Sequence, residues 1–467
     1  MQHSQSSSLP FQSEGLKIHL MQGQQNLLAL HQNNPERYPF LLESVASSIE
    51  DSTDKICSSR FDILFAFPQE TLTLSNDEKL EGYSDTIGNN FLDNLSNWWK
   101  SKRNNLIQCE QLPFSGGWFL YLGYELAKQV EPQLKLKKPS TPIAYATRIP
   151  AAIIYDHQTD CTYCICEDKF DFIGHLIIDS ENITTVDIKT VAKLKNINEE
   201  DETQYLNSIA KVKQYIVDGD IFQANLSRLW KAENIKDNVS AVSLYQKLRE
   251  TNPAPFSGLA VHNDFTIISS SPERLIKVTN GHAETRPIAG TRRREKDKDK
   301  DAALKAELIA HPKERAEHIM LIDLERNDLG RICTPGTIKV DELMVLESYA
   351  HVHHIVSNVC GQLKGGILPG DVIRAVFPGG TITGCPKVRC MEIISELEHE
   401  ARGAYTGSMG YLNHNGNMDI NILIRTITLK NNTLYFRAGA GLVADSIAHA
   451  ELEETRHKAR GLLLALQ

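Results

Sequence analysis

The sequence predicts a mixed α/β fold with antiparallel strands, and three observations lead to this prediction. Short apolar runs of strand character alternate with longer stretches of helical periodicity along most of the chain. Hairpin signals such as Asn415-Gly416 favour antiparallel neighbours, because this dipeptide suits the tight turn between two adjacent strands. No period of about 20 to 50 residues repeats, so a solenoid or a propeller is not expected.

The first part of the chain, residues 13–192, reads as an N-terminal subdomain. Residues 1 to about 12 are polar and have no periodicity, which predicts disorder. The runs that read as strands are FDILFAF (61–67), GWFLYLGY (117–124), AAIIYD (151–156), CTYCICED (161–168) and FIGHLIIDS (172–180). The charged stretch Lys193–Thr203 marks a boundary and opens a helix that is expected to run to about Val217.

The second part, residues 200–467, alternates further strands and helices. Its predicted strands are DIFQANLSRLW (220–230), TIISSSPERLIKV (266–278), YLNHNGNMDINILIRTITL (411–429) and TLYFRAGA (433–440). Its predicted helices are KERAEHIMLIDLERND (313–328), DVIRAVF (371–377), CPKVRCMEIISELEHEA (385–401) and EETRHKARGLLLAL (453–466). The charged segment Arg292–Asp301 is predicted to be a solvated loop beside a site.

Composition excludes several classes of protein. The chain has 467 residues with 41% hydrophobic and 23% charged residues, which is typical of a globular protein. The net charge of −9 argues against nucleic acid as a partner. The N-terminal residues do not resemble a signal peptide and no apolar run reaches membrane-spanning length, so no membrane association is expected. The nine cysteines form no even framework, which favours the reducing cytoplasm, and the cluster Cys161, Cys164 and Cys166 lacks a second ligand pair at zinc spacing.

Two predicted helices each carry two carboxylates three residues apart: Glu314 with Glu317, and Glu451 with Glu454. Residues three apart share a helix face, so four carboxylates would converge if the two helices meet. Such a group needs a cation, and hard oxygen ligands favour magnesium. The alternative is two solvated helix faces with ordinary ion pairs. A di-iron site is disfavoured, because only Glu454 and His457 have the Glu-x-x-His spacing that it requires.

Two glycine-rich strings lie near the C-terminus. Phe377–Lys387 (FPGGTITGCPK) is spaced like a phosphate loop, but Cys385 stands where the lysine of such a loop is required. Gly439-Ala440-Gly441 follows a strand, yet no second strand and no acid follow at the offsets of a dinucleotide site. Glycines of this kind let a ligand approach backbone N–H groups closely, which suits a carboxylate.

A polar strand face and one histidine complete the candidate site. Alternation places Gln223, Asn225 and Ser227 on one face of a strand, which is either solvent-exposed or lines a cavity. His354 lies in an apolar run, where a histidine is more often a hydrogen-bonded core residue than a catalyst.

Together these strings resemble the chorismate-utilising enzymes, a family that includes anthranilate synthase component I, aminodeoxychorismate synthase component I and the isochorismate and salicylate synthases. The resemblance rests on Phe377–Lys387, Gly416–Thr426 (GNMDINILIRT) and Ala438–Lys458, and is dense from about residue 205 onward. It implies antiparallel sheets stacked as a sandwich with helices outside. Residues 13–192 would then be the N-terminal region found in anthranilate synthase component I, and residues 200–467 the chorismate-binding catalytic region.

The resemblance also implies roles for individual residues. The implied cofactor is Mg²⁺, with the ligands Glu317 and Glu454 and the neighbouring Glu314 and Glu451. The implied chorismate-binding positions are Gly290, Thr291, Tyr405, Arg425, Gly439, Ala440, Gly441 and Lys458. Glu273 matches the general acid that protonates the leaving C4 hydroxyl, and His354 matches an active-site histidine. A tryptophan pocket is implied at Ser44, Ser59, Arg60, Phe61, Pro255, Phe256 and Ser257.

Gln223 separates two branches of the family. The water-using synthases carry a lysine here, and a glutamine cannot act as that base, so an aminating enzyme is expected. The strings Arg60–Pro68, Gly116–Ala127 and Met418–Thr426 resemble the aminodeoxychorismate synthase branch, which makes 4-amino-4-deoxychorismate toward 4-aminobenzoate and folate. Ala289 replaces the lysine of its best-known members and matches anthranilate synthases, which are therefore the alternative.

Two further expectations concern partners and class. No glutaminase segment is recognised, so ammonia is expected to come from a separate glutamine amidotransferase subunit. A non-catalytic binding or regulatory subunit is the alternative from another class. The intact set of acidic residues argues against it, because such a protein would be expected to have lost some of them.

Overall fold

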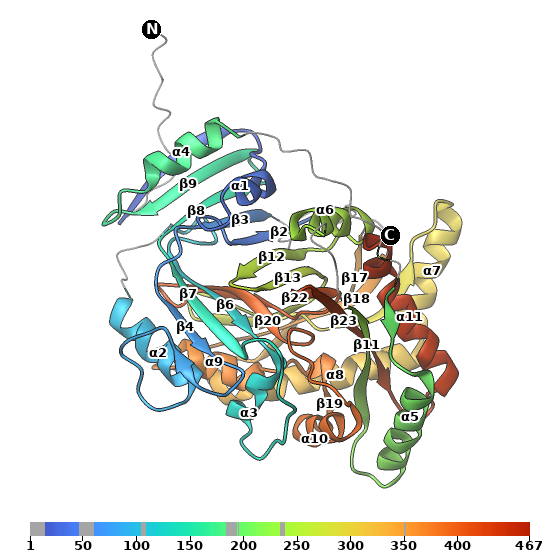
Figure 1. Ribbon diagram of the computed structural model, residues 1–467. Coiled ribbons are helices and arrows are strands. Elements are labelled where there is room, and N and C mark those ends of the chain that lie inside the picture. Colours follow the sequence, from blue (N-terminus) through green and yellow to red (C-terminus); the bar gives the residue numbers. More distant parts are fainter. Residues whose placement is uncertain are drawn as a thin grey trace.

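The computed structural model describes residues 15–45, 60–103, 109–183, 194, 196–233, 239–349 and 352–467. Within these ranges the chain forms two antiparallel sheets with helices around them (Figure 1). The mixed α/β class and the stacked antiparallel sheets are therefore confirmed. None of the helices in these ranges is long and apolar enough to cross a lipid bilayer.

The first sheet contains, in spatial order, β1 (Leu16–Gln22), β9 (Cys161–Glu167), β8 (Ala151–Asp156), β3 (Phe61–Ala66), β2 (Phe40–Glu43), β12 (Phe256–His262), β13 (Phe265–Ser271), β22 (Thr426–Lys430), β23 (Thr433–Leu442), β11 (Gln223–Ala232) and β10 (Asn198–Glu199), with β19 (Gly384–Cys385) also paired to β11. The second contains β16 (Ile288–Arg293), β18 (Val352–Gln362), β15 (His282–Thr285), β14 (Arg274–Thr279), β21 (Met418–Asn421), β20 (Ser408–Asn413), β6 (Gly117–Leu122), β7 (Ala144–Ile149), β4 (Thr71–Leu74) and β5 (Leu80–Glu81), with β17 (Lys339–Ser348) paired to β18. Both predicted regions of the chain contribute strands to each sheet.

The helices are α1 (Leu27–Asn33), α2 (Phe91–Lys102), α3 (Ala127–Val130), α4 (Ile173–Glu181), α5 (Glu202–Val217), α6 (Ala241–Thr251), α7 (Lys298–Ala310), α8 (Pro312–Ile332), α9 (Pro369–Val376), α10 (Lys387–Leu397) and α11 (Ala448–Ala465), with two short 3₁₀ turns, η1 (Tyr124–Leu126) and η2 (Gly380–Ile382). Helix α5 ends at Val217, as the sequence predicts.

Strand β6 explains how the two sheets stack. It is apolar and buried at every position, because both of its faces are covered. Trp118 and Leu120 belong to one apolar core, whereas Phe119 and Tyr121 belong to another that includes residues of the first sheet. The Phe119 ring stacks on Phe40 of β2 with the ring centroids 4.0 Å apart, which joins the two sheets.

Two of the corners at which the chain passes from one sheet to the other lie next to each other. Residues 266–278 read as one strand in the sequence, but β13 ends at Ser271 and β14 continues in the second sheet, so Pro272 and Glu273 form a corner. Proline has no N–H to donate, which ends the ladder at this point. The return corner joins β21 to β22 and contains Arg425, whose φ is 51°. Ser270 N donates to Arg425 O at 3.2 Å, so the two corners are in contact.

The segment 172–180 was predicted to be a strand, and this prediction is wrong: Ile173–Glu181 is helix α4. Its apolar residues Ile173, Leu176 and Ile177 have the i, i+3, i+4 spacing of a helix face. The helix packs across β1, β8 and β9, which buries Leu176. Packing against a sheet, more than strand propensity, therefore selects the helix.

The prediction of a solvated loop at Arg292–Asp301 is also wrong for part of that segment. Arg292 belongs to β16, and α7 begins at Lys298 with Asp297 as its N-cap. Asp301 is buried, and its Oδ1 lies 3.0 Å from His353 Nε2 on β18. This contact fixes the start of the helix on the second sheet.

Candidate active site

Strands β11 and β23 form one wall of the candidate site. They pair antiparallel over most of their length. A Cβ atom at Gly439 would lie 2.7 Å from the Tyr405 hydroxyl oxygen, and one at Gly441 would lie 2.6 Å from Gln223 Nε2. Real Cβ atoms do not approach other atoms this closely, so side chains from neighbouring segments cover both glycines directly. Ala440 between them is fully buried in the core.

Gln223 and Asn225 carry the polar face of β11, as the alternation predicts, whereas Ala224 and Leu226 are buried in an apolar core. The amide Nε2 of Gln223 donates to Glu317 Oε1 at 2.8 Å. Gln223 Oε1 and Asn225 Oδ1 are buried and have no hydrogen-bond partner in the described part of the chain. Buried polar atoms are normally paired, so two open acceptors on one face indicate a place where a ligand or water donates.

Glu273 lies at the corner between β13 and β14 with 6% of its surface exposed. Thr381 Oγ1 donates to Glu273 Oε1 at 2.7 Å. Burial raises the pKa of Glu273 to about 7, although Thr381 and the charges of Lys458 and Arg425 act in the opposite direction. A carboxyl with this pKa is protonated in part at neutral pH and can act as an acid. Thr381 carries no sequence signal of its own, although it lies within the glycine-rich string Phe377–Lys387.

Two cations stand close to this carboxyl. Lys458 of α11 donates to Gly439 O at 3.0 Å and pairs with Glu454 at 2.8 Å. The Arg425 guanidinium forms no hydrogen bond or ion pair with any residue in the described ranges. Burial lowers its pKa, whereas the charge of Glu273 raises it. A partly buried guanidinium that makes no direct ion pair is suited to an anionic ligand.

His354 and the Gly290 turn lie on the paired strands β18 and β16. His354 Nδ1 lies 2.9 Å from Thr291 Oγ1, and burial lowers the pKa of the imidazole to about 3, so the ring is neutral. Gly290 has a φ of 70° at a bulge in the pairing of β16 with β18. A Cβ at this position would lie 2.0 Å from Glu314 Oε2, so the turn requires glycine. Ala289 beside it is buried and has no functional group.

A buried ionic cluster lies beside Tyr405, with the Arg402 guanidinium carbon 5.6 Å from the centroid of the Tyr405 ring, and no sequence pattern pointed to it. Glu398 Oε1 accepts from Arg402 Nη2 at 2.7 Å and from Ser227 Oγ at 2.8 Å, which ties β11 to the segment that carries Tyr405. Burial raises the pKa of Tyr405 to about 12, whereas Arg402 lowers it, so the phenol stays protonated. It is therefore available as a hydrogen-bond donor beside Gly439.

The four predicted magnesium ligands lie on α8 and α11. Glu314 Oε1 accepts from Arg292 Nη1 at 2.7 Å, and its buried Oε2 has no partner among the described residues. Burial raises the pKa of Glu451, and the charge of Glu454 raises it further, whereas Lys313 of α8 lowers it. In the described ranges no three His, Cys, Asp or Glu side chains are gathered closely enough to hold a metal ion. The magnesium site stays a prediction.

Direct contacts thus connect most of the predicted site. One set joins Lys458, Gly439 and Tyr405, and another joins Gly441, Gln223 and Glu317. Electrostatic interactions link Arg425 to Glu273 and to His354. The residues come from β11, β16, β18, β23, α8, α11, the two adjacent corners and the segment between α10 and β20 that holds Tyr405.

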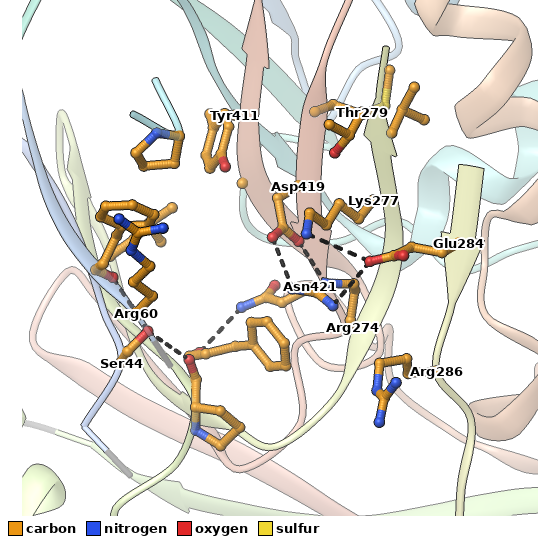
Figure 2. Close-up of a pocket in the computed structure, with 18 of the residues that line it drawn as sticks. Ser44, Arg60, Arg274, Lys277, Thr279, Glu284, Arg286, Tyr411, Asp419 and Asn421 are labelled. Carbon is orange, nitrogen blue, oxygen red and sulfur yellow. Dashed lines mark hydrogen bonds and ion pairs between the residues drawn. The ribbon is translucent and has the colours of Figure 1, made fainter. Parts of the chain in front are cut away.

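The residues predicted to form a tryptophan pocket line a separate cavity of about 1470 Å³ (Figure 2). Ser44, Arg60, Phe61, Pro255, Phe256 and Ser257 all line it, whereas Ser59 lies outside the described residues. Figure 2 shows Arg274 paired with Asp419 at the same cavity, with Arg274 Nε 2.9 Å from Asp419 Oδ1. None of the predicted catalytic, chorismate-binding or magnesium residues lines this space. Of the consecutive residues Glu273 and Arg274, only Arg274 lines this cavity.

Comparisons with known proteins identify the family to which this chain is similar. The profile of the chorismate binding enzymes matches residues 49–464. The chain is 44% identical over 362 residues to an anthranilate synthase component I-like protein of Synechocystis, covering 77% of this chain and 74% of that protein. It is 41% identical over 367 residues to aminodeoxychorismate synthase component 1 of Bacillus subtilis, covering 76% of this chain and 77% of that protein.

A solved structure of a related protein has the same fold. The crystal structure of anthranilate synthase component I from Streptococcus pneumoniae superimposes with a TM-score of 0.76 at 30% identity, covering 89% of this chain and 94% of that one. The relatives include synthases of both products, so they do not decide between the two reactions. Both the matched profile and the shared fold extend over most of the sequence, and the chain therefore belongs to the chorismate binding enzyme family.

Proposed function

We propose that this enzyme aminates chorismate with ammonia in a magnesium-dependent reaction whose product is 4-amino-4-deoxychorismate. The observation that carries the amination is Gln223, which donates its amide to Glu317 Oε1 at the position where the water-using members of the family have a lysine. A carboxamide has no basic nitrogen with which to activate water. Ammonia is therefore the nucleophile that this site suits.

The choice of product rests on sequence strings. Phe222–Arg228 and Met418–Thr426 resemble the aminodeoxychorismate synthase branch, and the Bacillus subtilis relative at 41% identity bears that name. Ala289 is the contrary observation, since it matches anthranilate synthases. With Ala289 in the turn, no side chain there can form a covalent adduct with the ring, so nitrogen arrives by direct attack of ammonia or after another nucleophile such as water.

Glu317 and Glu454, with Glu314 and Glu451 beside them, would hold Mg²⁺. Carboxylate oxygens are the ligands that this ion prefers, and the unpartnered Glu314 Oε2 and the repulsion between Glu451 and Glu454 are features that a cation would relieve. When bound, Mg²⁺ would supply positive charge that neutralises a carboxylate of the substrate and these side chains.

The remaining side chains account for binding and proton transfer. The unpaired Arg425 guanidinium and Lys458 would bind carboxylates of chorismate, with the Tyr405 hydroxyl as a further donor. Glu273 gives its proton to the C4 hydroxyl, the C4–O bond breaks, and water leaves. Ammonia forms the new C–N bond, and the resulting ammonium group releases a proton that restores Glu273. The balance is chorismate plus ammonia to 4-amino-4-deoxychorismate plus water.

A single incubation tests the proposal. The purified chain with chorismate, Mg²⁺ and an ammonium salt is expected to form 4-amino-4-deoxychorismate, and 4-aminobenzoate only after a separate lyase is added. Glutamine is not expected to replace ammonium, because a separate glutamine amidotransferase subunit would supply ammonia. Chromatography of the products is the measurement, with a reaction lacking ammonium as the control.

Three results would overturn parts of this assignment. Accumulation of 2-aminobenzoate without any lyase would identify anthranilate synthesis, the alternative that Ala289 favours. Turnover of glutamine by the chain alone would remove the need for a separate amidotransferase. No consumption of chorismate under any condition would favour a non-catalytic binding subunit.

We propose that the cavity of about 1470 Å³ binds tryptophan. Ser44 Oγ donates to Pro255 O at 3.4 Å, and the Arg60 guanidinium carbon lies 4.5 Å from the centroid of the Phe61 ring, so the predicted segments meet at one wall. Millimolar tryptophan is expected to raise the melting temperature, because a ligand that binds only the folded state stabilises it. Arg425→Lys serves as the control, because it alters the other site and is expected to keep this response. An unchanged melting temperature, with no tryptophan released on denaturation, would contradict the proposal.

A further inference from the structure

The polar face of β11 carries two buried acceptors, Gln223 Oε1 and Asn225 Oδ1, that no donor in the described ranges satisfies. The orientation of the Gln223 amide is fixed, because Nε2 donates to Glu317 Oε1 at 2.8 Å and this leaves Oε1 open. Gln223 has 4% of its surface exposed. A buried acceptor without a donor costs free energy, so a molecule that donates hydrogen bonds is expected to bind here.

The two amides lie over successive glycines of β23. A Cβ atom at Gly441 would lie 2.6 Å from Gln223 Nε2, and one at Gly439 would lie 2.7 Å from Asn225 Oδ1. Side chains two residues apart on a strand point to the same face and are about 7 Å apart along it. The two amides therefore follow one another along a single wall of the candidate site.

The backbone of Asn225 is hydrogen-bonded at both of its polar groups. Its N–H donates to Thr383 O at 2.9 Å, and its carbonyl oxygen accepts from Arg402 Nη2 at 2.7 Å. Arg402 is held in turn by Glu398, whose Oε1 also lies 2.7 Å from Arg402 Nη2. These bonds fix the strand at this residue, so the open acceptor of Asn225 has a defined position in the site.

The chemistry of the two proposed substrates identifies the donor. Chorismate carries two carboxylates and an ether oxygen, which only accept hydrogen bonds, and a single hydroxyl, which Glu273 protonates in the proposed function. A carboxylate would be repelled by the carbonyl oxygen of Asn225, and Arg425, Lys458 and Tyr405 are available to bind it. Ammonia has three N–H groups, and it is the substrate that needs acceptors.

We infer that the polar face of β11 is the binding site for ammonia, with Asn225 Oδ1 and Gln223 Oε1 as its acceptors. The inference rests on the proposed function, in which ammonia is the nucleophile. An N–H group that donates to an amide oxygen leaves the lone pair of the nitrogen free to attack the ring. Neutral amides suit this task, because a carboxylate in their place would bind the unreactive ammonium ion more strongly.

The test is the steady-state KM for ammonia, measured at one pH with an ammonium salt and with saturating chorismate and Mg²⁺. Asn225→Leu keeps the approximate size of the side chain and removes the acceptor. We expect KM for ammonia to rise about three- to tenfold, the usual contribution of one neutral hydrogen bond, while KM for chorismate stays the same. Lys231→Gln at the far end of β11 is the matched control, because Lys231 pairs with Glu233 at the surface, and both KM values should match those of the unaltered enzyme.

Two results with the variant would overturn the inference. An unchanged KM for ammonia would mean that water, and not the nucleophile, satisfies Asn225. A KM for chorismate that rises in parallel would make Asn225 a chorismate-binding residue. If Asn225→Leu does not fold, Asn225→Ala adds no bulk and decides by the same comparison.

The unaltered enzyme separates these failures from that of the proposed function. Either aminated product allows KM for ammonia to be measured, so a product other than 4-amino-4-deoxychorismate would correct the proposed function and leave this test in place. An unaltered enzyme that forms no aminated product would remove the proposed function and the inference together. Amination that persists in Asn225→Leu with a normal KM for ammonia would remove the inference alone.

Discussion

Replacing Glu317 or Glu454 by glutamine is expected to abolish chorismate turnover. Each substitution removes one negative charge from the proposed magnesium ligands, and neighbouring groups cannot replace an anionic oxygen ligand. Glu317→Gln keeps a carbonyl oxygen that can accept from Gln223 Nε2, which lies 2.8 Å from Glu317 Oε1, so this variant tests the charge and not the hydrogen bond. Steady-state rates measured across a magnesium titration check the prediction, together with calorimetric titration of Mg²⁺ into each variant.

Matched controls exist on both helices. Glu453→Gln lies next to Glu454, but its side chain is 54% exposed and pairs with Arg456, so activity should be retained. Asp323→Asn is the corresponding control on α8. Retention of near-normal rates by Glu317→Gln and Glu454→Gln at limiting magnesium would mean that the metal lies elsewhere or is not required.

Glu273→Gln is expected to lower kcat by on the order of 10²–10⁴, the usual contribution of a positioned general acid. A glutamine accepts the hydrogen bond from Thr381 but has no proton to give to the leaving hydroxyl. Chorismate binding should persist, because Arg425 and Lys458 are unchanged, so the loss should lie in kcat while KM stays similar.

The same substitution has a predictable effect on pH dependence. The pKa of Glu273 is raised to about 7, so the acid form needed for catalysis is present below this pH and is lost as the pH rises. The unaltered enzyme should therefore show an alkaline limb in kcat above about pH 7, and Glu273→Gln should lack it. Stopped assays between pH 5.5 and 9 check this. A limb that persists in the variant would assign the titration to another group.

Local patterns predicted much of the secondary structure and part of the site. The period of two in residues 220–228 correctly places Gln223 and Asn225 on one face, and the helix predicted at 313–328 lies within α8. The strand predicted at residues 172–180 was wrong because the apolar residues there fit both the strand period of two and the helical period of 3.6. Packing against the sheet beneath α4 selects the helix. The prediction that Asp301 is exposed to solvent was wrong. It rested on the charge of the side chain, but contact with His353 buries Asp301.

By itself the sequence determined which groups this protein can bring to a site: carboxylates three apart on two helices, the polar face of β11 and the glycines of β23. These features depend on residues a few positions apart, and local periodicity encodes them. Only the tertiary structure decided which groups meet. Gln223 contacts Glu317 across 94 positions, and Thr381 reaches Glu273 across 108. It also decided which acids keep a proton, because the pKa of a carboxyl depends on burial and on charges brought near it by the packing of two sheets.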